Sequence, residues 1–373
     1  MQSLKIKLLS IGKQLAPGWL TRWLRNKLEF QDWETESRKK NNPYIKAPDE
    51  FIFENSTMKA GIFYNQLQYH KHWIAACREL KVSYQIIYLE KADWMEQIEK
   101  SGCDVFLVWP DIRSQEIKQM WDERLRILVE EMNGRIYPSL KEIWLYENKR
   151  VQHYWLKVNG FKTPGTKVFY NEKEAVEFLQ NAQYPLVLKS NLGASASGVY
   201  IENTPGDAIK KAKQFFKHGY SPKRNAAGKK QKGSIYIQEY IPDTKEWRMV
   251  RIGDSYFGHG KDMRGQFHSG SGKANFDLPP AKAFELLKEI TQKGNFSSMD
   301  VDLFEDKVGN FYVNELQTVF GNSIAKEQMK INGVPGRYLI KSNGDFQFEA
   351  GSFCENHLCN LRLEYILKNL NLM

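Results

Sequence analysis

The stretch MDVDLFEDKVGNFYVNELQTVFG, residues 299–321, decides the fold. It contains two apolar runs joined by a polar turn, and this pattern predicts a β-hairpin. Asp302 lies on the first predicted strand, whereas Glu315 and Gln317 lie on the second. Residues two apart on a strand point to the same face, so Glu315 and Gln317 share one surface.

Apolar residues flank these acids, and buried carboxylates on one face repel each other unless a cation lies between them. Magnesium prefers hard oxygen ligands and keeps substrate phosphates among them. The hairpin therefore predicts a magnesium or manganese site formed by Asp302, Glu315 and Gln317, in preference to an ordinary surface hairpin.

A second stretch, YPLVLKSNLGASASGV at residues 184–199, predicts phosphate contacts. A short strand ends in Lys189, whose ammonium group is a point charge for phosphate oxygens. Small residues follow, and they let backbone N–H groups close over a phosphate. A flexible surface turn fits this loop equally well, so the loop alone does not decide its function. The candidate residues of the loop are Gly193, Ser195, Ser197 and Gly198.

A third stretch, SIYIQEYIPDTKEWRMV at residues 234–250, predicts contacts to a nucleoside. A β-rich run ends in Glu239-Tyr240-Ile241, whose backbone can meet an adenine ring. Glu246 follows Glu239 by seven residues, and its carboxylate can accept hydrogen bonds from ribose hydroxyls. The alternative is that these acids are simply solvated at the strand ends.

The fourth stretch, KDMRGQFHSGSGK at residues 261–273, holds the candidate catalytic residues Lys261, Arg264 and His268. Arg264 can stabilise charge on a transferring phosphoryl group. His268 can orient a substrate or act as a base, although a single histidine in a loop is more often only solvated.

Strands that alternate with helices between about 58 and 140 predict a small parallel sheet. No G-x-G-x-x-G follows the first strand, so the dinucleotide-binding fingerprint is absent. The predicted strands are 60–64, 84–89, 104–109, 185–188, 199–201, 234–241, 247–258 with a turn at Gly253-Asp254, 299–304 and 311–316. The predicted helices are 70–81, 93–100, 144–162, 206–217 and 280–292, with one more over the last dozen residues.

The 373-residue chain is 42% hydrophobic and 26% charged, which is the balance of a globular protein with two or three domains. No apolar run approaches the ~18 residues of a membrane span.

Four cysteines without a dense framework favour a reduced, cytoplasmic compartment. Cys354, His357 and Cys359 could be metal ligands, but three without a second cluster are a weak zinc signal.

The net charge of +10 is concentrated in two segments. Residues 1–30 form a basic amphipathic pattern, followed by a polar linker at 31–56. We expect this arm to pack on the main body or on a second subunit, and the alternative is contact with the inner face of a membrane. Residues 208–238 contain nine Lys or Arg and no acid. This segment is either a lid that attracts ATP and an anionic acceptor or a solvated helix and loop.

Together, the order and spacing of the four stretches resemble the ATP-grasp superfamily of carboxylate–amine ligases, best over residues 145–325. D-alanine–D-alanine ligases, glutathione synthetases and ribosomal-protein glutamate ligases belong to it. The resemblance implies a fold of the α/β plus α+β class, in which a small parallel pre-ATP-grasp domain precedes a two-lobed ATP-grasp fold. The implied segments are 1–56 (helical arm and linker), 57–143 (pre-ATP-grasp domain), 144–242 (lobe A) and 243–373 (lobe B and C-terminal helix).

The resemblance also implies the contacts to Mg-ATP. Lys149 opens a helix before a turn at 159–164 and corresponds to the lysine that reaches the α-phosphate, while Lys189 reaches the α- and β-phosphates. The loop 193–198 covers the triphosphate. The remaining implied roles are adenine binding by Glu239, Tyr240 and Ile241, ribose binding by Glu246, and metal binding by Asp302 and Glu315.

Two positions depart from the family pattern. The last motif usually reads Glu-x-Asn, and this chain has Glu315-Leu-Gln317, so the metal geometry is expected to differ. The residue before the helix lysine is often Asp, and here it is Asn148.

The implied reaction joins a carboxylate to an amine through an acyl phosphate, at the expense of ATP. Enzymes that attach amino acids to uronic-acid polysaccharides or teichuronopeptides are the branch that fits the basic segments. One alternative is a kinase on the same scaffold that phosphorylates a small-molecule or sugar hydroxyl. The other is a non-catalytic basic binding protein. No interleaved aromatic platform or helix-turn-helix accompanies the lysines, so no nucleic-acid partner is expected, and an oligomer is compatible with the arm.

Overall fold

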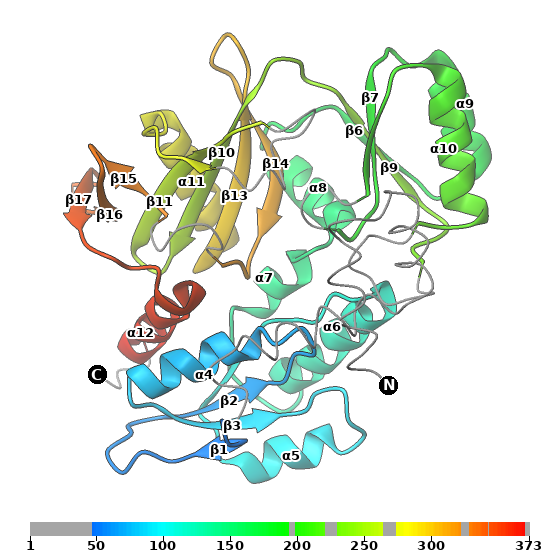
Figure 1. The fold of residues 1–373 in the computed structure, drawn as a ribbon. Helices are drawn as coiled ribbons and strands as arrows, with labels where there is room; N and C mark the ends of the chain where they lie inside the picture. The colour runs from blue at the N-terminus through cyan, green and yellow to red at the C-terminus, as the bar shows by residue number, and fades with distance from the viewer. Residues whose placement is uncertain are drawn as a thin grey trace, which may run out of the picture.

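The computed structural model describes residues 47–193, 198–220, 230–263, 274–321, 328–341 and 343–369. Three β-sheets organise this part of the chain, with one sheet below and two side by side above it in Figure 1. The predictions for the arm at 1–30 concern residues outside the described ranges. Among the described helices, none is long and apolar enough to cross a membrane.

The first sheet confirms the predicted small parallel sheet. Its elements are β1 (Glu50–Phe51), β2 (Lys59–Phe63), α4 (His70–Glu79), β3 (Ser83–Ile87), α5 (Trp94–Ser101), β4 (Val105–Leu107), α6 (Gln115–Glu130) and β5 (Ile136–Tyr137). The strand order is β1-β3-β2-β4-β5, and only the short edge strand β1 is antiparallel to its neighbour. Sequence analysis did not assign α6, which begins after Ser114 because the Ser114 hydroxyl accepts a hydrogen bond from the Ile117 N–H.

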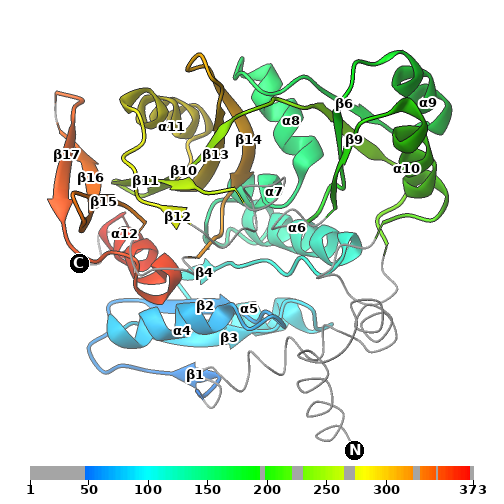
Figure 2. The same cartoon turned by 45° about the horizontal axis from the view of Figure 1, so that its top comes forward.

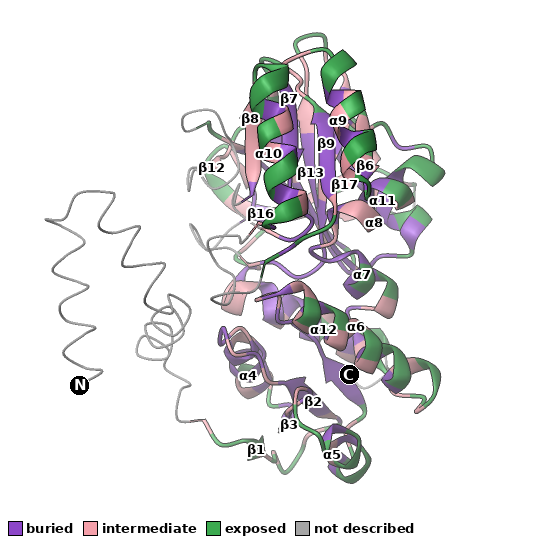
Figure 3. Cartoon of the chain, turned by 90° about the vertical axis from the view of Figure 1, so that its right-hand side faces the viewer, coloured by how far each residue is buried: buried purple, intermediate pink, exposed green. Residues whose placement is uncertain are grey.

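The second sheet is antiparallel and has the strand order β6-β9-β7-β8. Its elements are β6 (Thr166–Phe169), α9 (Glu172–Asn181), β7 (Leu186–Lys189), β8 (Val199–Glu202), α10 (Pro205–Lys217) and β9 (Ile235–Glu239). Leu179 and Phe215 from the two helices pack against Leu188 and Ile237. Figure 3 shows that α9 and α10 expose their outer faces and cover buried strands. The predicted helix at 206–217 is confirmed as α10, whereas β6 and α9 had not been assigned.

The third sheet has eight strands and contains the predicted hairpin. Its elements are β10 (Lys245–Ile252), β11 (Ser255–Lys261), β12 (Ala274–Asn275), α11 (Ala281–Gly294), β13 (Ser298–Glu305), β14 (Phe311–Gln317), β15 (Lys330–Ile331), β16 (Val334–Ile340) and β17 (Phe346–Ala350). The order is β14-β13-β10-β11-β16-β15, with β12 beside β11 and β17 beside β16. Phe284 and Leu287 of α11 pack on Met249 and Val301 of the sheet. The mixed α/β class is therefore confirmed.

The single helix predicted over 144–162 is wrong, because two helices replace it. They are α7 (Leu140–Leu145) and α8 (Lys149–Val158). Glu147 interrupts the run with a φ of 51°, in the left-handed region that a right-handed helix cannot use. The helix end predicted at Asn159-Gly160 is confirmed, with Gly160 at a φ of 78°. The break leaves Lys149 at the start of its own helix.

The last described helix, α12 (Cys359–Asn369), connects the first and third sheets. Leu363 and Ile366 belong to the core of the first sheet, whereas Leu361 belongs to the core of the third. In Figure 2 α12 lies between α4 and the strands of the third sheet. Although it is last in the sequence, this helix therefore packs on the first structural unit as well as the last.

Candidate functional site

Lys149 and Glu315 form an ion pair that joins α8 to β14. Lys149 Nζ lies 2.9 Å from Glu315 Oε1 and also donates to the carbonyl oxygen of Gly193 at 2.9 Å. Burial by itself would lower the pKa of Lys149, but Glu315 and Glu147 more than offset this effect and raise it. A buried cation thus lies at the start of the Gly/Ser loop, in one of the positions expected for a phosphate-binding lysine.

Glu147 belongs to the same cluster and was missed by sequence analysis. Its Oε2 accepts a hydrogen bond from the Gly193 N–H at 3.1 Å, and its Oε1 accepts one from Gln317 Nε2 at 3.3 Å. The side chain is 2% exposed, and burial raises the pKa of its carboxyl although Lys149 acts in the opposite direction. The available signal was an acid directly before Asn148-Lys149, and only the fold shows that it turns toward the loop.

Lys189, the last residue of β7, has neutral partners. Its Nζ donates to Gln238 Oε1 at 2.6 Å and to Asn314 Oδ1 at 3.1 Å. Burial lowers the pKa of Lys189 to about 8. Among the described residues no carboxylate is hydrogen-bonded to this ammonium group, so its charge is free to attract an anion such as a phosphate.

A β-bulge brings two consecutive residues of β14 into the site. Asp302 pairs with Glu315, the register shifts directly after Asp302, and Asn314 is the extra residue. A bulge breaks the alternation of side chains along a strand. Asn314 therefore reaches Lys189 while Glu315 reaches Lys149.

The three predicted metal residues lie together on one face. Asp302 and Glu315 are partners on adjacent strands, and Gln317 pairs with Asp300. Side chains that face each other in this way have Cβ atoms ~4.5–5.5 Å apart. Gln317 Nε2 also donates to Glu315 Oε1 at 2.7 Å. The two strands thus present a compact set of oxygen-bearing side chains.

A row of charges continues from Asp302 onto β10 and β11. Arg248 Nε lies 3.4 Å from Asp302 Oδ1, and Arg248 Nη2 lies 2.8 Å from Asp300 Oδ2. Lys261 Nζ donates to Asp302 and, at 2.8 Å, to Glu246 Oε1. Burial would raise the pKa of Asp302, but Lys261 and Arg248 reverse this and lower it. Glu246, the residue predicted to bind ribose, is therefore bonded to the same lysine, Lys261, as the predicted metal ligand Asp302. Sequence analysis missed the roles of Arg248 and Asp300 in this row.

The predicted adenine segment is the connection between the second and third sheets. Glu239 ends β9, and Tyr240 and Ile241 lead toward β10. The Glu239 N–H donates to the carbonyl oxygen of Gly165 at 2.7 Å, and Glu239 Oε2 accepts from the Gly165 N–H at 3.2 Å. The Glu239 side chain is exposed, and the next two residues are half-buried.

The Gly/Ser loop is described only at its two ends. Gly198 has a φ of 84°, and a Cβ atom there would lie 2.1 Å from Ser190 Oγ, so the position requires glycine. The carbonyl oxygen of Gly198 accepts a hydrogen bond from the Ser190 N–H at 2.9 Å. The candidates Ser195, Ser197, Arg264 and His268 lie outside the described residues.

The side chains present fit a metal ion bound together with phosphates. Across the described ranges, no three His, Cys, Asp or Glu side chains converge as a ready-made metal cage. Glu315 and Asp302 instead each face a lysine, Lys149 and Lys261. Magnesium does not need an all-protein cage, because substrate phosphates supply part of its shell. The same phosphates can replace Glu315 and Asp302 as the anionic partners of the two lysines, which leaves these carboxylates available to the metal ion.

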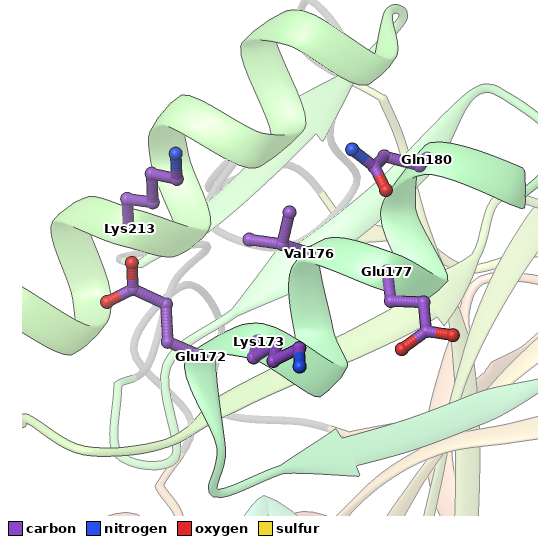
Figure 4. A pocket seen from close by; sticks show the side chains of 6 residues that line it. All are labelled: Glu172, Lys173, Val176, Glu177, Gln180 and Lys213. Atoms are coloured by element: carbon purple, nitrogen blue, oxygen red, sulfur yellow. The ribbon is translucent and has the colours of Figure 1, made fainter.

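A surface hollow lies elsewhere, between the outer faces of α9 and α10 (Figure 4). None of the candidate site residues lines it. Its lining is Glu172, Lys173, Val176, Glu177, Gln180 and Lys213. With one apolar side chain among charged and polar ones, it has the character of solvated helix surface.

Comparison with known proteins gives similarities in sequence and in structure. No family model matches the chain. A curated relative, the alpha-aminoadipate–LysW ligase LysX of Saccharolobus solfataricus, is 26% identical over 204 residues, which cover 52% of this chain and 68% of the relative.

Several solved structures share the arrangement of elements. The N5-carboxyaminoimidazole synthetase of Staphylococcus aureus, complexed with ADP, has a TM-score of 0.52 at 16% identity and covers 77% of this chain and 74% of its own. The D-alanine–D-alanine ligase of Bacillus anthracis, complexed with ATP, has a TM-score of 0.51 at 15% identity, with 70% and 87% covered. A RimK domain protein of Sphaerobacter thermophilus, described as ATP-grasp, has a TM-score of 0.50 at 15% identity, with 69% and 90% covered. At these identities the structural matches concern the fold.

Proposed function

The chain has the ATP-grasp fold, and on this premise we propose that it is an ATP- and magnesium-dependent carboxylate–amine ligase. One observation carries the proposal. Cationic side chains from α8 and β7 and acidic side chains from β13 and β14 meet at one place between the second and third sheets.

In this proposal each residue has a distinct task. Lys149 and Lys189 bind the phosphates of ATP, while Glu239, Tyr240 and Ile241 receive the adenine and Glu246 the ribose. Asp302, Glu315 and Gln317 hold magnesium, which neutralises charge on the transferring phosphoryl group.

The reaction that we propose has two steps. A substrate carboxylate oxygen attacks the γ-phosphorus, the bond to the β,γ-bridging oxygen breaks, and ADP leaves. The amine of the second substrate then attacks the acyl carbon and loses a proton, and inorganic phosphate leaves with the formation of an amide. The side chains of this site position the reactants and offset their negative charge, so no covalent enzyme nucleophile is required.

For the acceptor we propose an anionic chain, either a peptide or a cell-surface polysaccharide, to which the enzyme adds an amino acid. The support is electrostatic, since the protein carries a net charge of +10 and residues 208–238 hold nine Lys or Arg without an acid. A basic segment raises the local concentration of an anionic substrate.

A panel of amino acids, uronic acids and short anionic oligomers tests the proposal, with ATP-dependent phosphate release and amide formation by mass spectrometry as readouts. We expect one donor–acceptor pair to release phosphate in step with an amide product. Glu315→Gln should abolish the activity, because it removes a metal ligand and the partner of Lys149. Glu305→Gln, at the end of β13, is the matched control, since Glu305 accepts a hydrogen bond from Trp247 Nε1 at 2.7 Å and lies outside the site.

Two other results would replace the proposal. A phosphorylated product without free phosphate would identify a kinase. Strongly salt-dependent binding to a polyanion that persists in the double variant Asp302→Asn plus Glu315→Gln, without nucleotide binding in the wild type, would identify a basic binding protein.

A further inference from the structure

Glu147 is a buried acid to which the proposed function assigns no task. It lies in the corner between α7 and α8, where it is 2% exposed and has a φ of 51°. Residues with a side chain rarely adopt this left-handed conformation unless their surroundings require it. The Glu147 carboxylate accepts hydrogen bonds from the Gly193 N–H at 3.1 Å and from Gln317 Nε2 at 3.3 Å. A buried acid held in this conformation therefore contacts a proposed magnesium ligand.

Gln152 of α8 fixes this corner on β14. Its Oε1 accepts a hydrogen bond from the Leu316 N–H at 3.1 Å, and its Nε2 donates to the carbonyl oxygens of Leu316 at 2.7 Å and Leu145 at 2.8 Å. Gln152 is only 3% exposed, so these bonds are shielded from water. Leu316 lies between Glu315 and Gln317 in the sequence. The position of the corner relative to both proposed metal ligands is therefore set through backbone groups.

The amide group of Gln317 has a defined orientation in these surroundings. Its Nε2 lies 2.7 Å from Glu315 Oε1 as well as 3.3 Å from Glu147 Oε1. Carboxylate oxygens accept hydrogen bonds and do not donate them, so the NH₂ end of the amide faces the two glutamates. The amide oxygen, which is the atom able to bind magnesium, is turned away from them.

We propose that Glu147 is a positioning residue that holds the Gln317 amide with its oxygen toward the proposed magnesium site. This inference rests on the proposed function. Gln317 stands where the family pattern usually has Asn, and its side chain is one carbon longer. The longer side chain has one more rotatable bond, so it loses more conformational entropy when it is ordered. Glu147 supplies the partner that orders it, and groups that orient a metal ligand typically change metal affinity by about 10–100-fold.

The competing explanation is that Glu147 contributes only negative charge. In that case its carboxylate attracts Lys149 and any bound cation, and its contact with Gln317 has no effect on the metal. The charge effect does not depend on the side chain at position 317, whereas the positioning effect disappears when that side chain is too short to reach Glu147. A double-mutant cycle between the two positions separates the explanations.

Electron paramagnetic resonance of free Mn²⁺ gives the metal affinity of the full chain loaded with a non-hydrolysable ATP analogue. Glu147→Gln, whose single amide oxygen cannot serve both donors, should weaken Mn²⁺ binding at least about tenfold in the wild type. In the Gln317→Asn background the same change should weaken it less than about threefold. Glu305→Gln is the control in both backgrounds and should leave the affinity unchanged, since Glu305 bonds to Trp247 outside the site.

Glu147→Asp is a second test, because it keeps the negative charge but withdraws the carboxylate by one carbon. Asp also tolerates the left-handed conformation of this position better than most residues. The positioning role predicts that Glu147→Asp weakens Mn²⁺ binding at least about fivefold. Wild-type affinity in this variant would overturn the inference.

An equal loss of affinity from Glu147→Gln in the two backgrounds would also overturn the inference and leave the proposed ligase function standing. If Glu147→Gln does not fold, as judged by circular dichroism, Glu147→Asp decides. A wild-type chain that binds neither the analogue nor Mn²⁺ would overturn the proposed function itself, so the two failures are distinguishable.

Discussion

At the scale of single residues, the carboxylates of the proposed metal site already form ion pairs with lysine and arginine side chains of the same protein. Glu315 is paired with Lys149 at 2.9 Å, and Asp302 is paired with Lys261 and Arg248. A metal ion must therefore compete with lysines for the same oxygens. Nucleotide phosphates can shift this competition, because they draw the ammonium groups toward themselves.

Lys149→Met should consequently have opposite effects on metal and nucleotide. Without nucleotide, magnesium affinity should rise by roughly fivefold or more, because the competing cation is gone, whereas ATP affinity should fall by about tenfold or more. Isothermal titration calorimetry measures both. Lys307→Met is the control, since Lys307 is an exposed lysine whose partner is Asp243 and not a carboxylate of the proposed metal site. A parallel fall of both affinities would contradict the competition.

Lys189 should make nucleotide binding depend on pH. Burial lowers the pKa of its ammonium group to about 8, so the unliganded side chain loses its proton as the pH rises through that value. Phosphates favour the charged form, and binding at about pH 8.5 should therefore take up as much as one proton, whereas binding at about pH 6.5 should take up none at this residue. Calorimetry in buffers of different ionisation enthalpy measures the uptake.

Lys189→Arg distinguishes proton uptake by Lys189 from proton uptake by other groups, because a guanidinium stays charged over the whole pH range of the measurement. The variant should bind nucleotide without the proton uptake. Undiminished uptake in Lys189→Arg would assign the proton to another group. The same lowered pKa means that Lys189 destabilises the folded chain at neutral pH, and this cost falls progressively as the pH rises from about 8 toward the ordinary value of 10.5.

At the scale of elements, the bulge in β14 and the break between α7 and α8 create the site. The bulge adds Asn314 to the face that already carries Glu315. The break at Glu147 starts α8 at Lys149 and turns the Glu147 carboxylate toward Gly193. The bulge breaks the alternation of side chains along β14, so two consecutive polar residues reach the site.

Deletion of Asn314 tests the bulge. The flanking residues Val313 and Glu315 already pair in register with β13, so the shortened strand should form a regular ladder and the protein should fold. Lys189 loses a hydrogen-bond partner, and ATP affinity should fall roughly tenfold or more. Thermal melting and nucleotide titration are the measurements, and Glu305→Gln on the neighbouring strand is the control. An unfolded deletion variant or an unchanged ATP affinity would contradict this account.

At the scale of the whole molecule, buried polar contacts join the first and third sheets. Arg362 on α12 is 0% exposed and donates to Ser298 Oγ at 3.1 Å and to the carbonyl oxygens of His357 and Phe320 at 3.0 Å each. Its guanidinium also lies 6.0 Å from the ring centroid of Trp109, which belongs to the core of the first sheet. Arg362 is therefore one of the buried polar contacts that hold the first and third sheets together.

Arg362→Met should lower the free energy of unfolding by about 2–4 kcal/mol, because two buried acceptors and one part-buried acceptor lose their donor. Urea denaturation followed by circular dichroism measures the change. Arg126→Met, on an exposed part of α6, should leave the midpoint where it is. An unfolding midpoint of Arg362→Met at the wild-type urea concentration would show that Arg362 does not stabilise the contact between the first and third sheets.

Most of the regular elements, and the strands and loops that carry the candidate residues, could be predicted from the amino-acid sequence. Alternation, turn residues and small-residue loops are local signals, and the hairpin with Asp302 on one strand and Glu315 on the other follows from them. These local signals did not predict the elements whose sequence pattern is weak or interrupted. β6, α9 and the strands β15 to β17 were not assigned, and the run 144–162 was taken as one helix.

The charged residues that meet in the site are brought together by the three-dimensional fold alone. Lys149 and Glu315 are 166 residues apart, and Lys189 and Asn314 are 125 apart, so no local period relates them. The bulge at Asn314 and the left-handed φ of Glu147 arise because long-range packing outweighs the local preference of the backbone. A sequence pattern reports on a few neighbouring residues, whereas this site forms from residues far apart in the sequence that contacts between sheets bring together.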